Sequence, residues 1–292
     1  MKKIELIFAL AFLLGAASVG LPNTLCAAEF EEVQQPASKP LGIYSSIGID
    51  TNKAKEYLDS AGRMAMKGQH ERAQQLKADV ANELRRFIAH PTMYSGPNGI
   101  DTQKDLALLD LAGRMQMSED THDTSAALKN VVAADLRRFI AHPTGLQTAG
   151  GVNTQQVSSL LDLADRMQMS VDTGEISVDL KSVVADELRR FVAHPTMYSG
   201  PAGIDTEKDS ALLDLAQRMD MNAGTHKLST DLKAIVAADL RRFIQRPTGL
   251  QTASGVNTSM VSSLLDLADR MDKDVDTREI SVDLKNLVSA VL

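Results

Sequence analysis

The side chains that could do chemistry in this sequence lie close together in a segment that recurs along the chain. Residues 134–154 read ADLRRFIAHPTGLQTAGGVNT and combine a carboxylate, two guanidinium groups, an imidazole and a proline. The equivalent double arginines begin at Arg85, Arg137, Arg189 and Arg241, each 52 residues after the last. Such groups could clamp a phosphate, bind a metal, form an export signal or end a helix. A twin-arginine export signal is excluded, because such signals are N-terminal and are not repeated four times.

A cationic side chain stands directly before the proline of this segment in each of four repeats. These residues are His90, His142, His194 and Arg246. Metal ligands must converge on one ion, whereas side chains one repeat apart in a helical stack are separated by roughly 10 Å. A cation is favourable at the negative end of a helix dipole, and proline halts a helix. We therefore interpret the segment as a helix C-terminus and predict neither a metal site nor a cofactor.

An acidic residue interrupts the apolar face of the same predicted helix, as Asp135 does three residues before Arg138. A lone buried carboxylate is costly, and an arginine at i+3 is within helical reach. The sequence therefore predicts structural ion pairs, with a row of acids lining a groove as the functional alternative. The predicted pairs are Glu83–Arg86, Asp135–Arg138, Glu187–Arg190 and Asp239–Arg242.

A second series of acids and arginines stands at i, i+4 in the first predicted helix of each unit. Exposed pairs of this kind contribute only about 0.3–0.5 kcal/mol. We interpret the series as a solvated stripe or a clasp between helices. Its members are Asp59–Arg63, Asp110–Arg114, Asp162–Arg166, Asp214–Arg218 and Asp266–Arg270.

Residues 272–283, DKDVDTREISVD, carry carboxylates at positions 1, 3, 5 and 12 of a twelve-residue window, like an EF-hand calcium loop. Thr277 stands where such loops have glycine, and position 12 is Asp283 in place of glutamate. Chance placement of helix-capping residues explains the pattern better, and whether Asp272 to Asp283 binds calcium stays open.

Exposed aromatic residues on loops are frequent contacts for partners. Two HPTMYSGP loops, two units apart, carry Met93 with Tyr94 and Met197 with Tyr198. These four residues are the candidates for binding a protein or peptide partner. The sequence favours the other interpretation, in which each tyrosine fills the gap between adjacent units.

The elements that must position these side chains follow from an internal repeat. Glycine opens each of five units, at residues 48–98, 99–150, 151–202, 203–254 and 255–292. The MYSGP and GLQTA loops alternate, so a two-unit cassette of 104 residues is repeated. Each unit is predicted as a helix–loop–helix. In the second unit the first helix covers residues 101–117 behind a capping aspartate, and the second starts near Ser125. Neither helix can bury its apolar side by itself, which predicts an all-α, solenoid-like array.

The N-terminal residues have a different composition from the repeats. Lys2 and Lys3 precede an apolar run at 6–21 and small residues at 26–28. This pattern predicts a signal peptide at 1–28, then a flexible linker at 29–46 and a repeat domain at 47–292. Cleavage removes the one cysteine, Cys26, and leaves no membrane span. We expect a bacterial protein that is located in the periplasm or secreted.

The sequence favours a binding protein over an enzyme. It offers no nucleophile beside a fixed histidine and no phosphate-binding glycine loop after a strand. A net charge of -7 disfavours nucleic acid as a partner. We therefore predict a non-enzymatic scaffold for a protein or peptide partner. The alternatives are a structural spacer or self-assembling envelope protein, and a calcium-responsive helical module.

Overall fold

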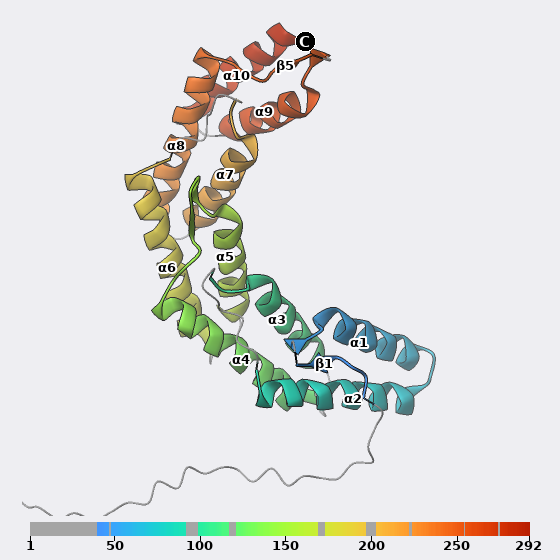
Figure 1. Ribbon diagram of the computed structural model, residues 1–292. Coiled ribbons are helices and arrows are strands. Elements are labelled where there is room, and N and C mark those ends of the chain that lie inside the picture. Colours follow the sequence, from blue (N-terminus) through green and yellow to red (C-terminus); the bar gives the residue numbers. More distant parts are fainter. Residues whose placement is uncertain are drawn as a thin grey trace, which may run out of the picture. The chain divides into compact units, whose positions relative to one another are not determined.

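The computed structural model describes residues 40–46, 48–91, 99–116, 121–168, 173–196, 203–221, 224–253, 255–273 and 275–292. These residues form ten α-helices in five consecutive pairs (Figure 1). Three two-stranded antiparallel hairpins precede the first, third and fifth pairs. The predicted all-α repeat array is confirmed, and the short hairpins are an addition that the sequence did not predict.

Each pair consists of a first helix and a second helix. The first helices are α1 (Thr51–Met66), α3 (Thr102–Gln116), α5 (Thr154–Gln168), α7 (Thr206–Asp220) and α9 (Thr258–Met271). The second helices are α2 (His70–Ala89), α4 (His122–Ala141), α6 (Gly174–Ala193), α8 (His226–Gln245) and α10 (Arg278–Val291). The remaining elements are β1 (Tyr44–Ser45), β2 (Gly48–Ile49), β3 (Gln147–Thr148), β4 (Gly151–Val152), β5 (Gln251–Thr252), β6 (Gly255–Val256) and the 3₁₀-helix η3 (Val275–Thr277).

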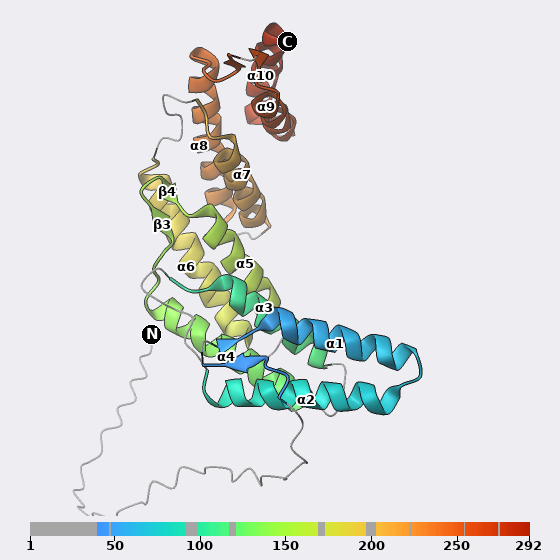
Figure 2. The same cartoon turned by 45° about the vertical axis from the view of Figure 1, so that its right-hand side comes forward.

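Contacts between helices follow a simple rule along the whole array. Each first helix packs on the second helix of its own pair and on the first helices of the neighbouring pairs. Each second helix likewise packs on the second helices before and after it. Figure 2 shows this succession from another side. Equivalent residues of successive units therefore meet at equivalent junctions, which lets one unit be compared with the next.

The first helices begin as the sequence predicts. An aspartate or asparagine side chain accepts a hydrogen bond from the backbone amide three residues later, as Asp205 does from Lys208 at 3.2 Å. Gly99 and Gly203 stand two residues before such caps with φ of 102° and 111°. A Cβ atom on Gly99 would lie 2.8 Å from the carbonyl oxygen of Thr144, so both backbone angle and space require glycine there.

The second helices begin earlier than predicted. α4 starts at His122, and Ser125, expected near the cap, is buried in its first turn. Its hydroxyl donates a hydrogen bond to the carbonyl oxygen of Ala112 at 2.6 Å and so ties the two helices of the pair together. A threonine directly before each of four second helices donates a hydrogen bond to the carbonyl oxygen of a methionine in the first helix, at 2.6 or 2.7 Å. These bonds are Thr121–Met115, Thr173–Met167, Thr225–Met219 and Thr277–Met271.

One hydrophobic cluster runs from Ile43 to Val288 through all five units. A phenylalanine after each double arginine is buried, as Phe139 is in α4. The first unit differs at Ser60, which is half-buried. The equivalent position in the other four units is a buried leucine, such as Leu111. Among the described helices, none combines the length and the apolar composition that crossing a bilayer needs.

Candidate functional site

Arginine side chains on the first helices join each unit to the one before it. Arg218 of α7 lies 2.8 Å from Asp162 of α5, and Arg270 of α9 lies 2.6 Å from Asp214 of α7. Arg114 of α3 contacts Asp59 of α1 in the same way. The acid and arginine that the sequence placed at i, i+4 thus pair between units, as an inter-helix clasp. The i, i+4 contact itself occurs between Asp110 and Arg114, at 3.3 Å.

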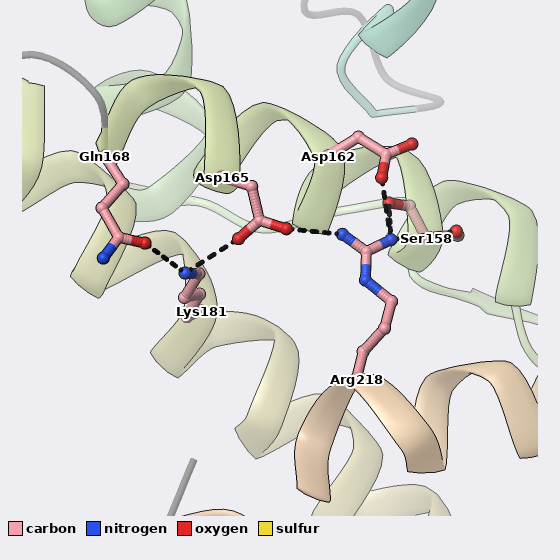
Figure 3. A network of polar contacts seen from close by, with 6 residues as sticks. All are labelled: Ser158, Asp162, Asp165, Gln168, Lys181 and Arg218. Carbon is pink, nitrogen blue, oxygen red and sulfur yellow. Dashed lines mark hydrogen bonds and ion pairs between the residues drawn. The ribbon is translucent and has the colours of Figure 1, made fainter. Parts of the chain in front are cut away.

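The clasp between α5 and α7 continues into a larger polar network, which Figure 3 shows at close range. Arg218 donates from Nη2 to Asp165 at 3.0 Å and from Nη1 to the backbone oxygen of Ser158 at 3.2 Å. The other oxygen of Asp165 lies 2.9 Å from Nζ of Lys181 in α6. Two cations from different helices thus hold one carboxylate.

The charge of Asp165 reflects this arrangement. Burial raises the pKa of its carboxyl group, but hydrogen bonds and positive charges from Lys181 and Arg218 outweigh burial and hold the pKa below its ordinary value. Asp165 is therefore ionised at neutral pH. The position behaves as a binding place for one carboxylate between a lysine and an arginine.

Residues of this network line a surface hollow that recurs one unit later. We call these two places the junction hollows. The hollow beside Asp165 is lined by Leu161, Asp165, Gln168, Lys181, Arg218 and Met219. The next hollow is lined by the residues 52 positions further on, Leu213, Gln217, Asp220, Lys233, Arg270 and Met271. Each combines charged side chains with leucine and methionine, which suits a segment that carries both polar and apolar groups.

A different polar feature is buried inside the second and fourth units. Asp105 of α3 and Asp209 of α7 are 1% and 0% exposed, and neither carboxylate forms a hydrogen bond with a described residue. Burial, followed by the charges of Asp135 and Asp101, raises the pKa of Asp105 to about 8. Asp209 reaches the same value through burial, then Asp239 and Asp205. Both side chains are therefore largely protonated at neutral pH.

The predicted ion pairs at the ends of the second helices have different surroundings in different units. Arg190 lies 3.4 Å from Glu187, in the predicted pairing. Glu83 instead accepts hydrogen bonds from the backbone amides of residues 41–44, including Ile43 at 2.5 Å and Tyr44 at 3.1 Å. The last residues of the expected linker are thereby fixed to α2. Arg86 is exposed and has no ion-pair partner within the described ranges.

The two aspartates of that series lie beside the buried acids. Asp135 and Asp239 are themselves buried, and their charges act on Asp105 and Asp209. Arg138 is exposed and pairs with no acid in the part of the chain that the structure describes. Arg242, predicted to pair with Asp239, is likewise exposed. These pairs therefore remain sequence predictions.

The other predicted residues fall into three groups. His90, His142, His194 and Arg246 each occupy the C-cap position of a second helix, as expected. The partner-binding candidates Met93, Tyr94, Met197 and Tyr198 lie outside the described residues. Arg278 is the seventh residue of the window Asp272 to Asp283 and the first residue of α10, so the second half of the window is helical. No group of three metal-binding side chains occurs among the described residues.

Comparisons of the chain with family models, with curated proteins and with solved structures found no match. We therefore infer function by comparing equivalent positions in the chain's own repeats.

Sequence reasoning missed both the junction hollows and the buried acids. The sequence did contain a signal for the buried acids, because this position is aspartate in the second and fourth units and apolar in the others. The apolar residues are Ala54, Val157 and Val261. The hollows had a weaker signal, since their lysine and arginine come from different helices of different units.

Proposed function

We propose that this chain is an exported, non-enzymatic helical-repeat protein that binds a protein or peptide partner along its unit junctions. The observation that carries the proposal is the recurrence of the junction hollow, with six residue positions of one hollow matched by six of the next. A row of equivalent sites on stacked helix pairs suits an extended partner that is contacted repeatedly.

The chemistry of the hollows supports binding better than catalysis. Each hollow places a lysine and an arginine beside leucine and methionine. Catalysis needs one unique constellation of groups, whereas these groups repeat with the units. Export rests on the signal pattern at residues 1–28, and the loops with Tyr94 and Tyr198 remain candidate contacts for the same partner.

The test is affinity capture with residues 29–292, followed by titration of the purified, identified partner in a calorimeter. We expect saturable binding that weakens when Lys181 and Lys233 are both changed to methionine. A Tyr94→Ser/Tyr198→Ser variant tests the loops separately, and Arg86→Gln is a matched control on an exposed arginine outside the hollows. Absence of any saturable partner, together with self-association on a sizing column, would contradict the proposal and favour a structural spacer.

A further inference from the structure

The junction between the second and third units lacks the carboxylate that occupies the next junction. Gly113 of α3 stands at the position of Asp165, immediately before the arginine of its own unit. Gly113 is exposed, and a Cβ atom built on it meets no atom within 4 Å. The place that a carboxylate fills one unit later is therefore open here.

The lysine that holds that carboxylate is still present. Lys129 of α4 corresponds to Lys181 and donates from Nζ to Gln116 at 3.1 Å. Lys181 donates to the equivalent Gln168 at 2.9 Å. The two ammonium groups are thus held in the same way beside their first helices, but Lys129 has no carboxylate partner among the described residues.

The arginine is present as well, and it has no partner among the described residues. Arg166 of α5 corresponds to Arg218, is exposed, and forms neither an ion pair nor a hydrogen bond with any described residue. By analogy with Arg218 and Arg270, Arg166 would pair with Asp110 of the preceding unit. Lys55 of α1 and Arg114 already hold that aspartate, at 3.0 Å and 3.3 Å.

We propose that Lys129 and Arg166 bind a carboxylate side chain of a partner protein or peptide at the place left open by Gly113. This inference rests on the proposed function and specifies the partner as an acidic segment. An aspartate or glutamate of that segment takes the role that Asp165 plays in the next junction. The chain's own occupant of the equivalent place is a carboxylate, which favours an acidic peptide over a phosphorylated ligand.

The test uses residues 29–292 and a fluorescein-labelled peptide of alternating glycine and glutamate, with a glycine–glutamine peptide as the uncharged reference. Fluorescence anisotropy at low salt measures the affinity. Gly113→Asp supplies the missing carboxylate from the chain itself, so we expect the affinity for the acidic peptide to fall about tenfold. Gly113→Asn has the same size without the charge and is expected to leave the affinity unchanged.

Two further variants separate this site from a general effect of charge. Gly62→Asp adds the same charge one unit earlier, where Arg114 is already held by Asp59 and Asp110, and it should leave the affinity unchanged. Asp165→Gly releases Lys181, but Arg218 keeps its ion pair with Asp162 at 2.8 Å, so this variant should leave the affinity unchanged as well. Circular dichroism and the melting temperature check that each variant is folded, and Gly113→Asp should melt higher than Gly113→Asn.

Equal affinities for Gly113→Asp and Gly113→Asn would overturn the site, as would equal binding of the glycine–glutamine peptide. A DNA oligonucleotide that binds more tightly than the peptide, with the same dependence on these variants, would overturn the carboxylate assignment. A natural partner that binds saturably and is held equally by the Gly113→Asp variant would overturn this site but leave the proposed function standing.

Discussion

The guanidinium group of Arg270 lies 2.6 Å from the carboxylate of Asp214, although 56 residues separate them in the sequence. Arg218 and Asp162 repeat the relationship one unit earlier, again 56 residues apart. Arg270 also donates to the hydroxyl of Ser210 at 2.7 Å. An interaction that the sequence places within one helix is thus made between neighbouring units.

We expect Arg270→Gln to lower the free energy of unfolding by about 0.2–1 kcal/mol, because exposed ion pairs are weak. A double-mutant cycle with Asp214→Asn, measured by urea denaturation, isolates the interaction between the two side chains. The coupling should shrink at high salt. A coupling of zero at low salt would contradict the clasp.

The buried acids predict an unusual dependence of stability on pH. Asp105 and Asp209 have a pKa of about 8 in the folded protein, above the ordinary 3.8. The folded protein therefore keeps protons that the unfolded chain releases, so the free energy of unfolding should fall as the pH rises from about 4 to about 8 and then level off. Denaturant titrations across this range check the slope.

Replacing these acids by the residue of the neighbouring units should remove that slope. Asp105→Val with Asp209→Val copies Val157, and it should raise the free energy of unfolding at about pH 9 by on the order of 2 kcal/mol per site. Asp162→Asn, at an exposed acid, is the control and should keep the wild-type slope. If the free energy of unfolding of the doubly substituted protein falls with pH as steeply as that of the wild type, the buried acids are not the cause of the slope.

Glu83 should make the first unit sensitive to acid. Burial raises its pKa, but the four backbone amides of residues 41–44 outweigh burial and lower the pKa below its ordinary value. The contact therefore stabilises the fold at neutral pH and is lost as the pH falls through the folded pKa. Glu83→Gln should cost about 1–3 kcal/mol at neutral pH. Amide hydrogen exchange of residues 41–44 measures the effect locally, and unchanged protection of these amides would contradict it.

The threonine directly before a second helix offers a test of packing within a unit. Thr173 is buried and donates to the carbonyl oxygen of Met167 at 2.7 Å. Thr173→Val keeps the shape but leaves that carbonyl without its donor, at an expected cost of about 1 kcal/mol in thermal denaturation. Thr173→Ser retains the hydroxyl and should lie closer to wild type. Equal losses in the two variants would point to packing of the side chain instead.

The sequence predicted the fold well because its strongest signals are local. The spacing of apolar residues fixed the helix type, and capping residues such as Asp205 fixed the starts of the first helices. The buried Phe139 and its equivalents follow from the same periodicity. The predicted start of the second helix near Ser125 was wrong, because a serine hydroxyl can bond to a neighbouring helix as well as to the backbone of its own helix.

The candidate site was harder to predict, because it depends on which residues meet between units. Spacing within one helix cannot tell whether Asp162 will meet Arg166 or Arg218. Asp110, the expected partner of Arg166, is held by Lys55 at 3.0 Å, and Lys55 belongs to a unit that is not adjacent to that of Arg166. Such relationships need the packing of three helices, which periodicity does not contain.

The unbroken cluster from Ile43 to Val288 has a consequence for how the array comes apart. Among the described helices, an inner pair packs against neighbouring pairs on two sides, whereas the first and the fifth pairs pack against one neighbouring pair. Local unfolding should therefore begin in the first and fifth helix pairs and proceed toward the middle pairs, so that a protease cleaves the outer pairs before the middle ones.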